Sequence, residues 1–170
     1  MKMTLLFDLK GVRIMAEREI LFRGKLKDKD EWIGEWIEGI YCPCYWDLYM
    51  RRVEKPRIII LSNKKKTDGL WREVIPETVG QYTGTKTYSK YDDELHKIFE
   101  DDLCYVTEFD CDGNDEQYLC QVMFDCSTFY FKDINSDWCR AFYEIEDIES
   151  DVEIVGNIHD NPEILKNPNP

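Results

Sequence analysis

A chain of 170 residues is long enough to bury a hydrophobic core without disulfide bonds, and it fits one domain or a domain with a small appendage. The hydrophobic fraction of 43% and the aromatic fraction of 14% exclude an intrinsically disordered chain, although 34% of the residues are charged. No run of about 18 uncharged apolar residues occurs, which excludes a membrane-spanning helix.

The start of the chain does not have the pattern of a secretory signal, because Asp8, Lys10 and Arg13 interrupt its apolar residues. We therefore expect a cytoplasmic protein with no membrane partner. The seven cysteines, an odd number, are then expected to stay reduced and to behave as small buried hydrophobic side chains.

Metal-binding patterns are weak in this sequence. Cys42 and Cys44 are separated by a single residue, whereas zinc motifs place about two to four residues between paired cysteines. A composite site that adds the distant His96 or His159 is the alternative. The acidic stretch 110–115 lacks the glutamate that completes a calcium loop. We expect no metal and no other cofactor.

The net charge of −13 conceals an uneven distribution. Residues 1–91 carry 18 basic and 13 acidic side chains, whereas residues 92–170 carry 4 basic and 22 acidic ones. Such asymmetry indicates an interaction surface. The candidate surface in the basic half is a cluster between residues 51 and 72, formed by Arg51, Arg52, Lys55, Arg57, Lys64, Lys65, Lys66 and Arg72.

Residues 1–17 are interpreted as an N-terminal extension. Lys10, Gly11 and Val12 are compatible with a purine-rich ribosome-binding sequence, which would make Met15 the natural start. The alternative is a genuine strand in which the apolar residues TLLF pack on a sheet.

The elements that follow are predicted to be mostly strands. EILFRGK and WIGEWIEGIYC read as two strands joined by a polar turn, and RIIIL and WREVI as a second, basic hairpin that projects from the body. PETVGQYTG is expected to be a structured loop with one helical turn that begins at Pro76 and ends with a left-handed Gly80. The polar residues 85–102 show little periodicity.

The acidic half is predicted to contain further hairpins. Residues 103–109 and 116–125 form two strands around a turn at Asp112 and Gly113, and alternating aromatic residues predict a strand over 127–133. At the end, Asn161 is expected to cap a turn that starts with Pro162.

Five sequence blocks, in order, resemble the YopX family of phage and prophage proteins. They are REILFRGK from Arg18, EWIEG from Glu35, PETVGQYTG from Pro76, KIFEDD from Lys97 and VGNIHDNPEIL from Val155. The resemblance implies a β-rich fold with small-barrel character and a phage or prophage origin, and it brings no catalytic residues. We therefore predict a mainly β fold, either a small barrel or a strongly bent antiparallel sheet built from hairpins, with short helical turns.

The YopX-like domain is expected to span residues 18–165, with the basic hairpin as an insertion at about 41–72 and a disordered tail over 166–170. Its signature positions are expected to be structural, and a ligand site built on them is the alternative. Family members usually have Gly where this chain has Asp101, and Asp tolerates positive φ. The signature positions are Pro76, Glu77, Thr78, Gly80, Gln81, Gly84, Phe99, Glu100, Asp101, Gly156, Asn157, Asn161 and Pro162.

The sequence favours a non-enzymatic accessory protein that acts through contacts with a host or phage protein and forms homo-oligomers. Nucleic-acid binding through the basic hairpin is the first alternative, with Trp46, Tyr49 and Trp71 available for stacking on bases. The second is an acidic mimic of nucleic acid that binds a basic host protein. Catalysis by either histidine is the least favoured hypothesis, because no nucleophile or phosphate-binding motif accompanies them.

Overall fold

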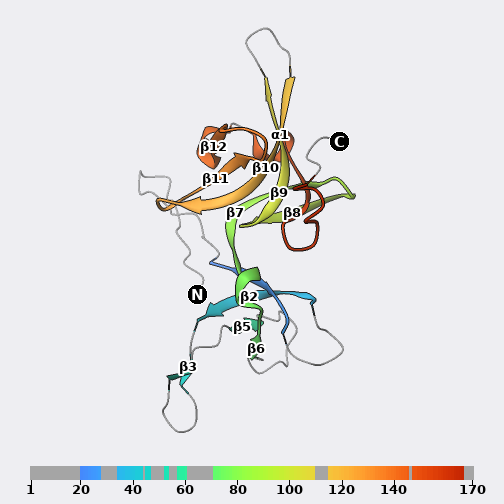
Figure 1. Ribbon diagram of the computed structural model, residues 1–170. Helices are drawn as coiled ribbons and strands as arrows, with labels where there is room; N and C mark the ends of the chain where they lie inside the picture. The colour runs from blue at the N-terminus through green and yellow to red at the C-terminus, as the bar shows by residue number, and fades with distance from the viewer. Residues whose placement is uncertain are drawn as a thin grey trace, which may run out of the picture. The chain divides into compact units, whose positions relative to one another are not determined.

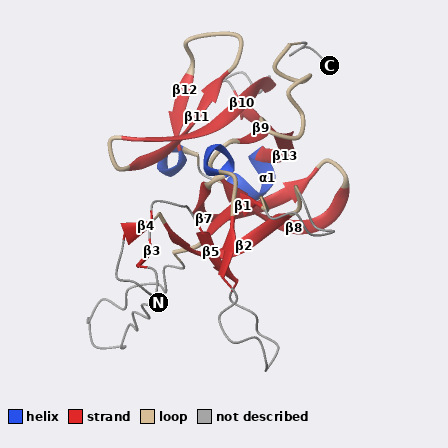
Figure 2. Cartoon of the chain, turned by 60° about the horizontal axis from the view of Figure 1, so that its bottom comes forward, coloured by secondary structure: helices blue, strands red, loops and turns tan. Residues whose placement is uncertain are grey.

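The computed structural model describes residues 20–27, 34–43, 45–46, 52–53, 57–60, 71–109, 115–145 and 147–166 (Figure 1). The chain divides into two compact units, Met1–Gly84 and Thr85–Pro170. Strand β7, Gly80–Ser89, begins in the first unit and ends in the second. Both units are built mainly from strands, which confirms the predicted fold class, and the helices are single turns (Figure 2).

The first unit contains an antiparallel sheet in which the start of β7 pairs with β1, β1 with β2, β2 with β5, and β5 with β6. A separate two-stranded ladder joins β3 and β4. The elements are β1 (Phe22–Lys25), β2 (Trp36–Cys42), β3 (Tyr45–Trp46), β4 (Arg52–Val53), β5 (Arg57–Ile60), β6 (Trp71–Glu73) and the 3₁₀ turn η1 (Pro76–Thr78).

One face of this sheet is apolar and closely packed. Ile58 and Val74 are fully buried, and a Cβ on Gly24 would lie 3.2 Å from a side-chain atom of each. The side chains of Ile58 and Val74 therefore pack against the backbone of β1 at a position that only glycine fits without rearrangement. The basic hairpin, predicted to project from the body, is therefore part of this sheet, because its first strand, β5, lies between β2 and β6.

The second unit contains the strand order β12, β11, β10, β9, β13, β7, with β8 also paired to β7. The neighbours from β12 through to β13 pair antiparallel, whereas β13 pairs with β7 in parallel. The elements are β8 (Asp92–Phe99), β9 (Asp102–Phe109), β10 (Asp115–Asp125), β11 (Thr128–Asp133), β12 (Cys139–Ala141), η2 (Phe142–Glu144), α1 (Ile148–Asp151) and β13 (Val152–Asn157).

Apolar residues cover both faces of this second sheet. On one face Val106, Val122 and Phe131 are fully buried, and Phe142 of η2 stacks on Phe131 with ring centroids 4.2 Å apart. On the other face a smaller cluster contains Leu103, Leu119 and Val155. The alternating aromatic pattern that predicted β11 thus reflects burial of one side chain in two.

Several sequence predictions are corrected by this arrangement. The described strands do not close into a barrel, so of the two predicted architectures only the open sheet remains. The polar stretch 85–102, whose low periodicity predicted no element, contains all of β8 and the second half of β7. Its Thr and Tyr residues favour strands. No apolar alternation is visible, because the buried Thr87 is polar and Tyr88 and Tyr91 are exposed. Gly80 begins β7 rather than ending η1 in a left-handed conformation, because its φ is not among the positive values and Val79 closes the turn.

Candidate interaction surfaces

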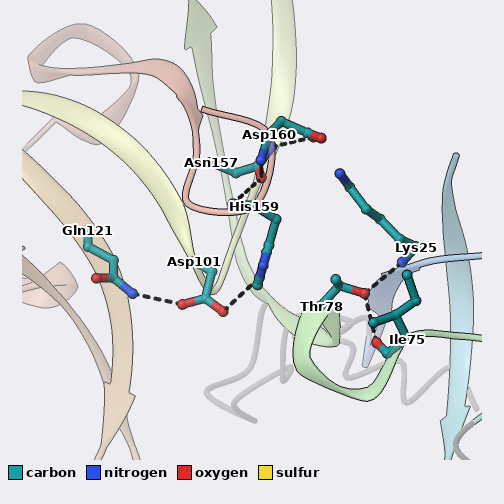
Figure 3. A network of polar contacts seen from close by, with 8 residues as sticks. All are labelled: Lys25, Ile75, Thr78, Asp101, Gln121, Asn157, His159 and Asp160. Atoms are coloured by element: carbon teal, nitrogen blue, oxygen red, sulfur yellow. Dashed lines mark hydrogen bonds and ion pairs between the residues drawn. The ribbon is translucent and has the colours of Figure 1, made fainter. Parts of the chain in front are cut away.

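The first signature block forms a structural link within the first unit. Pro76 occupies the first turn of η1, as predicted. The hydroxyl of buried Thr78 accepts a hydrogen bond from the Lys25 backbone N–H at 2.9 Å and donates one to the Ile75 carbonyl at 2.8 Å (Figure 3). One side chain therefore satisfies two backbone groups and fixes η1 against β1.

The last signature block is a turn held together by its own asparagines. The Asn157 Oδ1 atom accepts hydrogen bonds from the backbone N–H groups of His159 and Asp160, at 3.0 and 2.9 Å. The Asn157 Nδ2 atom donates to Asp160 Oδ2 at 2.9 Å (Figure 3). Asn161 Oδ1 accepts from the Asn157 N–H at 3.3 Å, so its side chain reaches back toward β13 rather than only capping the turn after it.

Gly156 makes this close approach possible. Its φ is 154°, and a Cβ built on it would lie 2.8 Å from Cγ of Asn161. A larger residue would therefore meet both a strained backbone and the Asn161 side chain.

Asp101, in the KIFEDD block, links that block to the last signature block and to β10. Its φ of 68° confirms the predicted turn geometry. Its Oδ1 atom accepts a hydrogen bond from Gln121 Nε2 at 2.8 Å, and its Oδ2 atom lies 3.4 Å from His159 Nε2 (Figure 3). Its carbonyl accepts from the Ile158 N–H at 3.1 Å. The His159 side chain therefore reaches a residue 58 positions away in sequence.

A groove of about 470 Å³ lies within the second unit. We call it the acidic groove, and it is lined by Tyr88, Thr107, Gln117, Glu149, Ser150, Asp151, Val152 and Glu153. None of these residues was predicted from the sequence to form a binding site. The available signal in the sequence is the acidic run EIEDIESDVE at residues 144–153, which does not reveal which strands lie beside it.

Four neighbouring strands provide one side of the acidic groove. Glu153 of β13 is in register with Tyr88 of β7 and with Tyr105 of β9. Thr107, two residues after Tyr105, is opposite Gln117 of β10. Paired residues and residues two apart share a face, so these groove side chains project from the same side of the sheet.

Helix α1 brings the remaining carboxylates to the acidic groove. Its N-cap, Asp147, accepts a hydrogen bond from the Ser150 N–H at 3.3 Å. The buried Thr87 hydroxyl on β7 contacts the carbonyls of Val152 and Ile148, the latter at 3.1 Å. These bonds hold α1 against β7, so Glu149 and Asp151 are presented by a short but anchored turn.

The electrostatics of the acidic groove favour a cation. Three carboxylates line it, and Tyr88, which is 43% exposed, offers an aromatic ring beside them. Carboxylates and aromatic faces both attract ammonium and guanidinium groups. In the described part of the chain no group of three His, Cys, Asp or Glu residues has the arrangement needed to hold a metal ion.

The predicted basic surface is only partly described. Arg57 is opposite Glu73 in the register of β5 and β6, whereas Arg72 is opposite Ile58, so the two arginines lie on opposite faces of the sheet. Arg52 belongs to the separate β3–β4 ladder. The other members lie outside the described residues; they are Arg51, Lys55, Lys64, Lys65 and Lys66.

A basic and aromatic cluster on β1 and β2 was not predicted from the sequence. Arg23 and Lys25 both lie over the Trp36 ring, 4.6 and 5.3 Å from its centroid. Strand registers place Arg57 on the same face, together with Glu38. The alternation of Arg23 and Lys25 in the first strand was the available signal, but it predicted only that they share a face.

His96 and the described cysteines of the second unit lie outside the lining of the acidic groove. His96 Nε2 lies 2.7 Å from Asp92 Oδ1, and this hydrogen bond lowers the pKa of Asp92 below 3.8. Cys104 and Cys120 are buried opposite each other on β9 and β10, and burial raises the pKa of Cys120. As expected for buried thiols, these two act as core residues. Cys126 and Cys139 are exposed, so the prediction of buried cysteines is wrong for these two.

The molecule is thus a mainly β protein of two units, with internally bonded signature turns and a carboxylate-lined groove. The YopX protein family matches residues 43–166, and the chain belongs to that family. This supports the coarse expectation of a phage-associated protein and carries no information on mechanism. No curated protein and no solved structure is similar to the chain. No helix among the described residues is long and apolar enough to cross a membrane.

Proposed function

We propose that this YopX protein is a non-enzymatic accessory protein of a phage or prophage, and that it acts by binding a basic segment of a partner protein. The observation that carries the proposal is the acidic groove, with Glu149, Asp151 and Glu153 around the exposed ring of Tyr88. The surrounding half of the chain carries far more acidic than basic residues, so its field attracts cationic partners before contact.

The signature turns support a structural role for those blocks. Thr78, Asn157 and Asp101 direct their polar atoms to neighbouring backbone and side-chain groups of the same chain. A ligand would have to replace those bonds, at a cost of about 1 kcal/mol or more for each. A partner that enters the acidic groove need not replace such hydrogen bonds, because the carboxylates on its wall already face solvent.

A binding titration with a fluorescent nona-arginine peptide tests the proposal. The wild-type chain should bind it, with an affinity that falls as salt is raised. Glu149→Gln/Asp151→Asn/Glu153→Gln should weaken binding roughly tenfold or more, since each lost contact to a cation is worth about 0.5 to 1 kcal/mol.

The matched control is Asp115→Asn/Asp137→Asn/Glu163→Gln, which removes the same number of charges from exposed positions outside the acidic groove. This control should lower affinity only slightly, through the long-range field. If both triple variants lose affinity equally, the peptide recognises net charge rather than the groove, and the proposal fails. Such a result would favour a diffuse acidic mimic of nucleic acid.

A second candidate function, nucleic-acid binding, is favoured by one observation. Arg23 and Lys25 lie over Trp36, and Arg57 is on the same face. A labelled single-stranded oligonucleotide should then be retained at low salt, and Arg23→Gln/Lys25→Gln should reduce retention. Lys64→Glu/Lys65→Glu/Lys66→Glu tests the basic hairpin separately. No retention by the wild-type chain at low salt would remove this function.

A further inference from the structure

Two tyrosines flank Glu153 on the sheet of the second unit. Glu153 of β13 is in register with Tyr88 of β7 on one side and with Tyr105 of β9 on the other. Residues opposite each other on neighbouring strands project from the same face of a sheet, with the strands about 4.8 Å apart. A row of ring, carboxylate and ring therefore crosses the sheet at the acidic groove, whose lining includes Tyr88 and Glu153.

The two rings of this row differ in what covers them. The Lys90 Nζ atom lies over the Tyr105 ring, 5.8 Å from its centroid, and Tyr105 also packs against the smaller apolar cluster of this sheet. Tyr88 is 43% exposed, and in the described part of the chain no cation lies over its ring. The chain's own ammonium group therefore occupies one ring and leaves the other open to a second cation.

The carboxylates of the acidic groove are not committed to other groups. Glu149 and Asp151 belong to α1 and Glu153 to β13, and all three line the groove. Among the described residues, none of these three carboxylates takes part in an ion pair or a hydrogen bond. Binding a partner through them therefore breaks no side-chain interaction of the fold.

Arg140 shows, elsewhere in the same unit, how a cation uses a ring and a carboxylate together. Its guanidinium lies over the Trp138 ring, 6.0 Å from the centroid, and its Nη2 atom is 2.6 Å from Glu108 Oε1. Its Nε atom also donates a hydrogen bond to this oxygen, at 2.6 Å. One planar group therefore contacts an aromatic face and a carboxylate at the same time.

The open side of the row favours arginine over lysine. A guanidinium is flat, so it can stack on Tyr88 while the N–H groups at its edge donate to Glu153 beside the ring. An ammonium group is a compact charge that is more strongly hydrated, so it gains less from leaving water for an aromatic face. Repulsion from Lys90 confines either cation to the Tyr88 side of Glu153.

We infer that the acidic groove is an arginine-binding site, in which one guanidinium group of a partner protein stacks on Tyr88 and pairs with Glu153. Glu149 and Asp151 then attract the basic residues that flank this arginine. The inference rests on the proposed function, because it names the side chain that the basic partner places in the groove. Lysine-rich segments should bind the same groove more weakly, because they form the charge pairs with less gain from stacking.

Paired titrations with fluorescent nona-arginine and nona-lysine, which carry equal charge, test the inference. The quantity measured is the ratio of the two Kd values, and the wild-type chain should prefer nona-arginine. Tyr88→Leu should lower this preference roughly two- to fivefold, since an exposed contact between a cation and a ring changes affinity by about that factor.

Tyr143→Leu is the matched control, because Tyr143 is 80% exposed and lies outside the lining of the acidic groove. This variant should keep the wild-type preference. A preference that Tyr88→Leu leaves unchanged overturns the inference, as does an equal loss of preference in the two variants.

Two further changes separate loss of the ring from loss of the fold. Tyr88→Phe keeps an aromatic face and should retain the wild-type preference, whereas a loss as large as in Tyr88→Leu would contradict stacking. Lys90→Gln leaves Tyr88 in place and uncovers the Tyr105 ring, so it should tighten nona-arginine more than nona-lysine. Lys166→Gln removes the same charge from an exposed position outside the groove and should tighten both peptides equally. A Lys90→Gln variant that behaves like Lys166→Gln counts against selection by the rings.

Different results would remove the proposed function and the arginine site. A wild-type chain that binds neither peptide removes the proposed function. If Glu149→Gln/Asp151→Asn/Glu153→Gln weakens both peptides while Tyr88→Leu leaves the ratio of their Kd values unchanged, the groove binds basic segments without selecting arginine. The proposed function would then stand and the arginine site would not.

Discussion

The C-terminal signature turn and the acidic groove both include residues of β13 and use polar residues in opposite ways. In the turn, Asn157 and Asn161 direct their side-chain polar atoms at the backbone of the turn and at Asp160. In the acidic groove, Glu149, Asp151 and Glu153 line open space. The polar side chains of this turn are therefore committed to the fold, whereas those of the acidic groove have atoms available to a partner.

The largest effect is expected from Gly156→Ala, which would break the turn. The added Cβ meets Asn161 and the backbone has a φ of 154°, so we expect a loss of about 2 to 4 kcal/mol in the free energy of unfolding. Urea denaturation measures it. Gly84→Ala is the control, because its φ is 95° but nothing lies within 4 Å of the added Cβ. Equal losses in the two variants would show that the Asn161 contact contributes nothing.

Thr78→Val tests whether the first signature block is equally structural. The isosteric change leaves the Lys25 N–H and the Ile75 carbonyl without their partner, and we expect a loss of about 1 to 3 kcal/mol. Thermal and urea unfolding measure it, and Thr78→Ser, which keeps the hydroxyl, is the matched control. If Thr78→Val were as stable as Thr78→Ser, the two hydrogen bonds would not stabilise the fold.

A turn outside the signature blocks should respond in the opposite direction. Cys126 and Ser127 join β10 to β11 with φ values of 47° and 69°, a geometry that Asn and Gly adopt readily. Cys126→Asn/Ser127→Gly should therefore stabilise the chain by about 1 kcal/mol. Chemical denaturation measures the free energy of unfolding. The control variant with the two residues in reverse order, Cys126→Gly/Ser127→Asn, tests whether the gain depends on which residue occupies each turn position. Destabilisation by the Asn-Gly pair would mean that the Cys126 side chain has a role in the fold.

The smallest effect concerns the exposed Asp92 at the start of β8. Because its pKa is lowered from 3.8, its ionised form favours folding above that value, and the contribution is lost as pH falls through the folded pKa. A carboxyl NMR titration should find Asp92 below 3.8, and His96→Asn should shift it upward. An unchanged pKa in that variant would assign the shift to the Glu94 N–H bond instead.

The sequence predicted strands where side chains alternate between core and solvent, as in β10 and β11, and turns where residue type restricts the backbone, as at Pro76 and Asp101. It did not predict β7 and β8, because Thr, Tyr and charged residues there leave no apolar period. The contact of His159 with Asp101 and the lining of the acidic groove depend on which strands become neighbours. Local residue patterns carry no information about those long-range pairings.

The parallel pairing of β7 with β13 has a consequence for the order in which the protein becomes functional. The Thr87 hydroxyl contacts the Val152 carbonyl across 65 positions of sequence, and the acidic groove includes residues on both sides of that gap. Closing so long a loop is slow relative to forming hairpins. The acidic groove is therefore completed only after Glu153 has left the ribosome, so a shorter nascent chain has no groove with which to capture a basic partner.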